Sequence, residues 1–179
     1  MLSFLNLFNL KCILANLLFP VLNILSDGKF HSGEAIAKHF NVSRVSIWQA
    51  IAEGERLGVK IFSVRGKGYS LSHPIQLLDE EKIKHAVGEM ASRFNIKVFD
   101  VTDSTNNFLM QEAPKGYPHA SCVATNIQTS GKGRRGRQWQ SSLGENLTFS
   151  FLWRFTKGAA ALSGLSLAVG VALIRSLKK

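Results

Sequence analysis

Cysteine is scarce in this sequence of 179 residues, and the scarcity limits the disulfides and cysteine metal sites that the fold can contain. The two cysteines, Cys12 and Cys122, lie far apart in unrelated contexts, so we expect neither a disulfide framework nor a cysteine metal site. The five histidines are scattered, and neither a Ser-His-Asp order nor a Cys-His pair emerges. We therefore expect no metal site built from protein ligands, and a reducing cytoplasm as the location.

Acidic residues are also few, since 12 Asp and Glu stand against 22 Lys and Arg, for a formal net charge of +10. A field of this sign favours an anionic partner such as nucleic acid, a nucleotide or a lipid head group. With 45% hydrophobic and 19% charged residues, the composition is otherwise that of an ordinary globular chain. The length allows one substantial domain or two small ones.

The first 19 residues are largely apolar with Lys11 as their one charged residue, which raises the question of a membrane segment. No basic region precedes this stretch and no small-residue cleavage site follows it, as a secretory signal would require. A membrane-spanning helix would also have to bury Asn6, Asn9 and Asn16. We expect residues 1–19 to be an amphipathic extension or the product of a misassigned start codon rather than a membrane anchor.

The pattern that follows predicts three short helices with helix-turn-helix spacing. Pro20 is expected to open the first helix. Ser32 can cap a second helix that ends at Phe40, and Ser43 can cap a third that runs toward Leu57. The last two helices should pack through apolar faces. The side chains assigned to these faces are Ile36, Ala37, Phe40, Val45, Trp48 and Ile51.

A β-hairpin is predicted directly after the third helix. The segments "KIFSV" and "YSL" read as strands, and the turn "RGKG" between them carries two basic residues, as the wing of a winged helix would. Residues 20–72 are therefore predicted to form a winged-helix DNA-binding domain. Glu53 and Glu55 weaken its basic stripe, and winged helices also serve as protein-protein modules. The residues expected to contact DNA are Ser43, Arg44, Ser46, Gln49, Arg65 and Lys67.

The remaining chain predicts a second domain of the α/β (α+β) class. Residues 73–78 read as a linker, because the dipeptide His73-Pro74 is extended and a helix with acidic residues in its first turn begins near Asp79. Residues 79–179 then alternate between strand and helix. The segments expected, in order, are the strand "IKVFDVT", the helix "DSTNNFLMQEA", the strand "SCVATNIQT", a glycine loop, the strand "NLTFSFLWRF" and an apolar helix from about Ala160 to Leu177.

The glycine loop "SGKGRRGRQW" combines three glycines with four positive charges. Gly131 to Gly136 fit the dinucleotide pattern G-x-G-x-x-G, but "RQWQSSLGEN" after them shows no helical period, so we regard the match as accidental. No P-loop spacing occurs in the chain. Glycines next to basic side chains still suit a phosphate, and the loop follows a buried strand. A solvated basic loop and a nucleic-acid contact remain the alternatives.

Four segments together resemble the family of bifunctional biotin-protein ligases and biotin operon repressors. They are "DGKFHSGEAIAKHFNVSRVSIWQAI", "GKGYSL", "DSTNN" and "QTSGKGRRGRQW", and the similarity runs from about Pro20 to the end. The resemblance implies a class II synthetase-like catalytic domain that activates biotin with ATP to biotinyl-adenylate and transfers it to a lysine of the biotin carboxyl carrier protein. It also implies repression of biotin synthesis genes at operator DNA, Mg²⁺ as the companion of ATP, and a homodimer formed through the catalytic domain.

The resemblance also assigns roles to residues of the second domain. Arg134 would stabilise negative charge on the α-phosphate during catalysis. Helix capping is the alternative role for Ser104. The residues implied to bind biotin are Ser104, Thr105, Asn106, Gln128, Lys132, Gly133 and Arg134. The residues implied to form the adenylate and phosphate loop are Gly131, Lys132, Gly133, Arg134, Arg135, Gly136, Arg137 and Trp139.

Two departures from the family qualify this assignment. Lys132 stands where the family commonly has arginine, which keeps the charge but loses the planar fork. The sequence ends at Lys179, before a Lys-Trp-Pro-Asn-Asp type motif, the rest of the sheet and the small C-terminal barrel of the family. We therefore expect a truncated and catalytically incomplete chain. The alternative is a stand-alone winged-helix regulator with a remnant ligand-binding domain.

Overall fold

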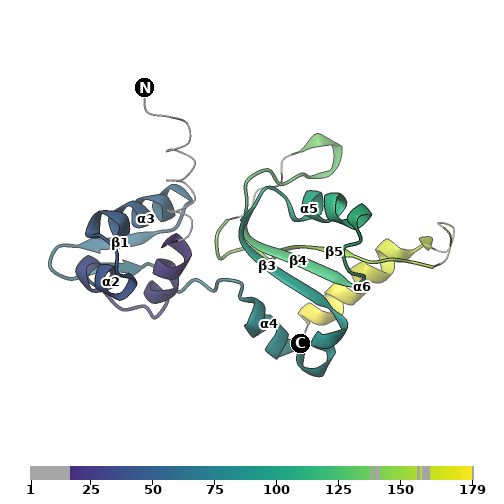
Figure 1. Ribbon diagram of the computed structural model, residues 1–179, viewed down its shortest axis with the longest axis horizontal. Coiled ribbons are helices and arrows are strands. Elements are labelled where there is room, and N and C mark those ends of the chain that lie inside the picture. Colours follow the sequence, from purple (N-terminus) through teal and green to yellow (C-terminus); the bar gives the residue numbers. More distant parts are fainter. Residues whose placement is uncertain (1–16, 138, 140–141, 157, 159–161, 179) are drawn as a thin grey trace.

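The computed structural model describes residues 17–137, 139, 142–156, 158 and 162–178, except for the side chain of Arg134. Most of the apolar segment 1–19 thus lies outside the described residues. Figure 1 shows two lobes, a helical lobe with a two-stranded hairpin and a lobe built on a three-stranded sheet, joined by an extended segment. The α/β class and the order of the two parts are those predicted.

The helical lobe has the predicted helix-turn-helix and wing. Helical residues 17–25 precede α2 (Gly33–Phe40) and α3 (Arg44–Arg56), and β1 (Ile61–Val64) pairs with β2 (Gly68–Leu71). Both predicted caps form, since the Ser32 and Ser43 hydroxyls accept hydrogen bonds from the N–H groups of Ala35 and Ser46. Asn41 makes the turn between α2 and α3 in the left-handed conformation, with φ of 52°.

The prediction that the first helix begins at Pro20 is wrong, because residues 17–19 are already helical. Leu18 and Phe19 are 2% exposed and belong to the core, so the lobe extends beyond the boundary drawn at residue 20. Proline is tolerated early in a helix, where its missing N–H has no intrahelical partner. Of the residues before Pro20 that the structure describes, Leu18 and Phe19 thus belong to the packed domain.

The core of this lobe forms where helix 17–25 crosses α3. Leu22, Leu25, Ile47 and Ala50 are all fully buried in one core cluster, and burial of each large aliphatic side chain contributes about 1.5–3 kcal/mol. Gly54 permits a close approach of three elements, because a Cβ there would lie 3.2 Å from the Ile61 Cδ1 and 3.3 Å from the Leu18 Cδ1. This glycine lets α3 touch helix 17–25 and the wing at the same point.

The second lobe is a mixed sheet in the order β3-β4-β5. The parallel strands β3 (Asn95–Thr102) and β4 (Ser121–Gln128) are joined through α5 (Thr105–Glu112), and β5 (Thr148–Leu152) is antiparallel to β4. Its further elements are α4 (Glu80–Val87), η1 (Gly88–Arg93), η2 (Ala113–Lys115), η3 (Arg134–Gly136) and α6 (Leu165–Leu177). The central strand β4 is buried along most of its length. The first candidate site, described below, lies at its carboxyl end.

Two of these elements are shorter than the sequence predicts. β5 ends at Leu152, before the aromatic residues Trp153 and Phe155. Helix α6 begins at Leu165 rather than near Ala160, because Gly164 adopts a left-handed conformation with φ of 86° directly before it. Residues 159–161 lie outside the described part of the chain. No residue of α6 is buried.

The predicted linker at residues 73–78 is extended and held at both lobes. The Ser26 hydroxyl donates to the Ile75 carbonyl at 3.0 Å, and the buried Asn126 side chain accepts from the Leu78 N–H at 2.8 Å. Ile75 also lies against Gly144, where an added Cβ would overlap its side chain. The linker is therefore fixed between the first helix and the sheet.

A cross-strand pair of threonines in the sheet gives a first prediction. Thr148 is 6% exposed, and its hydroxyl has no hydrogen-bond partner among the described residues, whereas the hydroxyl of its neighbour Thr125 donates to the Ile127 carbonyl at 2.9 Å. Thr148→Val is expected to raise the free energy of unfolding by up to about 1 kcal/mol, and Thr125→Val to lower it by about 1 kcal/mol. Urea unfolding of the two variants measures the difference, and equal effects would contradict it.

Candidate functional site

The first candidate site lies at the carboxyl ends of the parallel strands β3 and β4. Pairing continues beyond the strands, since the Thr129 N–H donates to the Thr102 carbonyl at 2.9 Å and the Ser130 N–H to the Asp103 carbonyl at 2.8 Å. The N-terminus of α5 and the start of the glycine loop are thereby brought to one edge of the sheet. This edge is where open α/β sheets bind ligands.

Gln128 connects the elements that meet there. Its Oε1 accepts hydrogen bonds from the Thr105 N–H at 2.8 Å and from the Thr105 hydroxyl at 3.2 Å. The Thr105 and Ser150 hydroxyls are 2.8 Å apart, which extends the network to β5. Among the described residues these bonds occupy Oε1 and leave the Nε2 of Gln128 for another acceptor. Ser150 was missed in the sequence, where one serine within an apolar strand gives no signal.

The remaining α5 residues of the predicted biotin set divide by exposure. Ser104 and Thr105 are each 2% exposed, and Asn106 is exposed. The Ser104 hydroxyl caps α5 by accepting from the Asn107 N–H at 3.4 Å. Ser104 therefore caps α5, and the cap holds the Thr105 N–H where the Gln128 Oε1 accepts its hydrogen bond.

The glycine loop is a tight reversal of the chain. The Gly133 N–H donates to the Arg137 carbonyl at 2.6 Å and the Trp139 N–H to the Gly131 carbonyl at 2.8 Å. Gly131 is buried, and a Cβ there would lie 2.8 Å from the Gln128 Nε2 and 2.8 Å from the Trp139 carbonyl oxygen. No helix occurs in the described residues between the loop and β5, whereas a dinucleotide turn leads directly into a helix.

The basic side chains of the loop face solvent. Lys132, Arg135 and Arg137 are exposed, Trp139 is 52% exposed, and the side chain of Arg134 lies outside the described part. Because the N–H groups of Gly133 and Trp139 are already donated within the loop, an anion would be met mainly by cationic side chains. A hydrogen bond from the Ser104 N–H holds the pKa of the nearby Asp103 carboxyl below its usual range, which keeps one negative charge at this edge.

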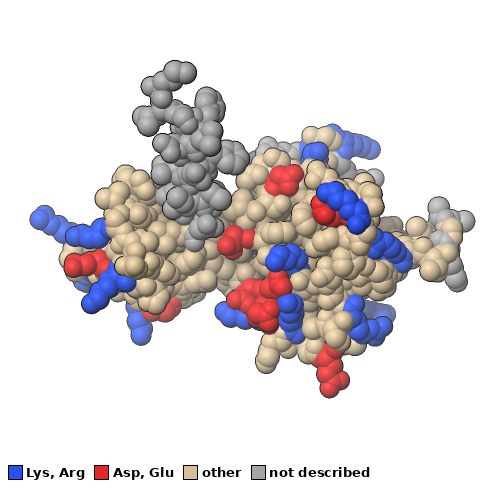
Figure 2. Space-filling view, in the orientation of Figure 1, with Lys and Arg blue, Asp and Glu red and all other residues tan. Residues whose placement is uncertain are grey.

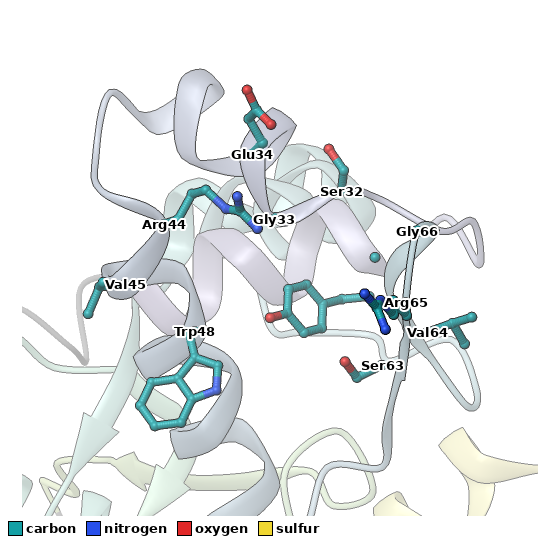
Figure 3. A pocket seen from close by; sticks show the side chains of 12 residues that line it. Ser32, Gly33, Glu34, Arg44, Val45, Trp48, Ser63, Val64, Arg65 and Gly66 are labelled. Atoms are coloured by element: carbon teal, nitrogen blue, oxygen red, sulfur yellow. The ribbon is translucent and has the colours of Figure 1, made fainter.

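The second candidate site is a groove of about 710 Å³ between α3 and the wing (Figure 3). Arg44 from α3 and Arg65 from the wing turn toward the space between these elements (Figure 3). Figure 2 shows Lys and Arg side chains at the outer end of this lobe with acidic side chains among them, and the two kinds are mixed on the other lobe as well. Within the groove, Glu34 adds a carboxylate to the guanidinium groups of Arg44 and Arg65.

The predicted DNA-contacting residues are only partly gathered in this groove. Arg44 and Arg65 line it. Ser43 and Ser46 are engaged in the cap of α3, with their hydroxyls 2.9 Å apart, and the ammonium of Lys67 lies 6.0 Å from the ring centre of Phe30. The last residue of the set, Gln49, is partly exposed on α3.

The prediction that Val45 and Trp48 pack against α2 is wrong, since each side chain is 61% exposed. The buried positions of α3 are Ile47, Ala50, Ile51 and Gly54. These positions follow the spacing i, i+3, i+4, i+7 and form one face, so Val45 and Trp48 lie on the outward side of the helix.

Two comparisons with known protein families match the two lobes. The HTH domain matches residues 18–70, and the biotin/lipoate A/B protein ligase family matches residues 98–179. The chain therefore carries an HTH domain followed by a domain of the biotin/lipoate A/B protein ligase family. The first match starts at Leu18, in agreement with the buried residues before Pro20.

Among individual proteins, the chain is similar to the bifunctional ligase/repressor BirA of several bacteria. It is 41% identical over 159 residues to the protein of Salmonella typhimurium and 40% identical over 156 residues to that of Escherichia coli. These alignments cover 89% and 87% of this chain but 48% and 47% of the relatives. The chain thus spans about half the length of the curated relatives it matches.

Neither a membrane span nor a metal-ligand cluster occurs in the described residues. No helix in this part of the chain has both the length and the hydropathy that crossing a membrane requires. Nor do three or more His, Cys, Asp or Glu side chains gather there in a group that could hold a metal ion.

Proposed function

We propose that this chain acts in ATP-dependent biotinylation and in DNA-binding repression of biotin synthesis genes. The observation that carries the proposal is the junction of Gln128, Thr105 and Gly131, which joins a basic glycine loop to the carboxyl ends of parallel strands within a ligase-family domain. The relatives that share both domains are bifunctional ligase/repressors. The proposed substrates are biotin and ATP, and the acceptor is a lysine of the biotin carboxyl carrier protein.

The ligand-binding step is proposed for the edge of the sheet described above. The Nε2 of Gln128 can donate to an oxygen of biotin, while its Oε1 keeps Thr105 in place. Asn106 is exposed beside it. Lys132, Gly133 and Arg134 would then close over the ligand as part of the loop.

The chemical step is proposed as attack of the biotin carboxylate on the α-phosphate of ATP, with pyrophosphate leaving and biotinyl-adenylate forming. Arg134, assisted by the exposed Lys132, Arg135 and Arg137, would stabilise the negative charge that develops on the α-phosphate. Mg²⁺ would enter the site bound to the phosphate groups of ATP. In proteins Mg²⁺ is commonly held by one or two carboxylates together with the phosphates of the substrate.

Ligand binding and activation are tested separately. Isothermal titration with biotin and with a non-hydrolysable biotinyl-adenylate analogue tests the site, and biotin-dependent exchange of pyrophosphate into ATP tests activation. Binding with exchange supports the ligase proposal. Binding without exchange assigns this chain to ligand recognition, and absence of both would overturn the ligand site.

DNA binding is proposed for the groove between α3 and the wing. Because Arg44 and Arg65 can neutralise phosphates, Arg44→Ala and Arg65→Ala are each expected to reduce the slope of log K against log salt concentration by about 1. Lys115→Ala is the matched control, since Lys115 lies in the other lobe and pairs with Glu112. Fluorescence anisotropy with a labelled random duplex measures the slopes. Unchanged slopes in the arginine variants would place the phosphate contacts elsewhere.

A stand-alone winged-helix regulator is the second candidate function. It is favoured by the composition of the core cluster, most of which comes from helix 17–25, α2, α3 and the hairpin, while Ile127 and Leu143 are its members from the second lobe. DNA binding without pyrophosphate exchange would support it.

We further propose a cytoplasmic location, where the free thiol of Cys122 would stay reduced, and a homodimer formed through the second lobe.

A further inference from the structure

The outward face of α3 presents two large apolar side chains to solvent. Val45 and Trp48 are each 61% exposed, whereas Ile47 and Ala50 between and beyond them are fully buried. Val45 and Trp48 are three residues apart, so they lie next to each other on one side of the helix (Figure 3). Adjacent exposed apolar side chains of this kind are typical of an interaction surface.

The charge around this apolar pair indicates what it binds. Both side chains line the groove that also contains the guanidinium groups of Arg44 and Arg65, and Glu34 from the first turn of α2 contributes a carboxylate to the lining. An apolar centre with arginines on two sides suits a polyanion whose interior edge is partly apolar. The major groove of DNA has this character, because phosphates flank it and the C5-methyl groups of thymine project into it.

We infer that Val45 and Trp48 recognise the methyl groups of thymines in neighbouring base pairs. The inference rests on the DNA-binding function proposed above and adds the base that is read. Three residues of helix advance about 4.5 Å, which lies between one and two base steps of about 3.4 Å on one strand. One turn of α3 can therefore place each apolar side chain against a methyl group of an adjacent pair.

The test uses the whole chain and DNA in which single methyl groups are removed. Duplexes are first selected from a random library, and deoxyuridine then replaces each thymidine of the selected site in turn, which deletes the C5-methyl group and keeps base pairing. At two neighbouring positions the replacement is expected to weaken binding about fourfold, the effect of losing one buried methyl group. Trp48→Ala should lose this sensitivity at one of these positions, and Val45→Ala at the other.

Phe62→Ala is the matched control, because Phe62 is an aromatic residue of β1 that is 55% exposed and does not line the groove. It should keep the full response to deoxyuridine. Binding that is insensitive to deoxyuridine throughout would overturn the inference and leave the proposed DNA function standing. No retention of any duplex at low salt would overturn both.

A protein partner for the same surface gives a different result. If Trp48→Ala changed the sedimentation coefficient of the chain but left its affinity for the selected duplex unchanged, the apolar pair would belong to a protein contact. That outcome would also overturn the inference.

Discussion

Replacing Gly68 with alanine is expected to disrupt the wing and to abolish DNA binding. Gly68 has φ of 101°, and a Cβ there would overlap the backbone carbonyl of His31 and lie 2.7 Å from the Ser32 Cα. The backbone cannot move away easily, because the neighbouring Tyr69 exchanges two hydrogen bonds with His31, at 2.8 and 2.9 Å. We expect a loss of at least about 3 kcal/mol in the free energy of unfolding, measured by urea titration with circular dichroism.

Gly66→Ala is the matched control in the same turn. Gly66 also has a positive φ, 81°, but a Cβ there would meet nothing within 4 Å. Only the backbone strain applies, so we expect a cost of about 1 kcal/mol and retained DNA binding. Similar losses in the two variants would show that the close approach of the wing to His31 does not determine its stability.

The second large effect is expected for Gln128→Leu. The substitution keeps the approximate volume but removes the acceptor of the Thr105 N–H and hydroxyl, and the leucine cannot donate to a ligand. A buried donor left without a partner costs about 1–3 kcal/mol, so the second lobe should lose stability by that amount. Affinity for the biotinyl-adenylate analogue should fall at least about tenfold, the equivalent of one hydrogen bond of about 1.4 kcal/mol.

Gln111→Leu provides the comparison, because Gln111 lies on an exposed position of α5. It should change neither the unfolding free energy nor the affinity by a measurable amount. If Gln128→Leu lowered stability but bound the analogue normally, Gln128 would be a structural residue of the α5 cap and the proposed ligand contact would be wrong.

Local signals in the sequence predicted the elements of this molecule well. Ser32 and Ser43 cap their helices because a serine before an apolar period can receive an N–H three residues later. The turn between β1 and β2 was found because glycines permit the positive φ that the hairpin requires. The α/β character of the second lobe followed from the alternation of strand and helix.

Features that depend on how elements face each other were less predictable. Val45 and Trp48 are as apolar as Ile47 and Ile51, and only their angular position on α3 distinguishes an exposed from a buried side chain. The start of the first helix was missed because Pro20 is a strong local signal, whereas the burial of Leu18 depends on α3 and β1. The bond network of Gln128 joins three segments that are distant in sequence, so no local pattern reports it.

The packing at Gly54 has a thermodynamic consequence for recognition. Because Gly54 has no side chain, α3 packs at one point against both helix 17–25 and β1 of the wing. The groove between α3 and the wing is formed before any ligand arrives, so little backbone entropy has to be lost on association. With this preorganisation, the free energy of the proposed DNA contacts serves to discriminate between sequences and is not used up in ordering the lobe.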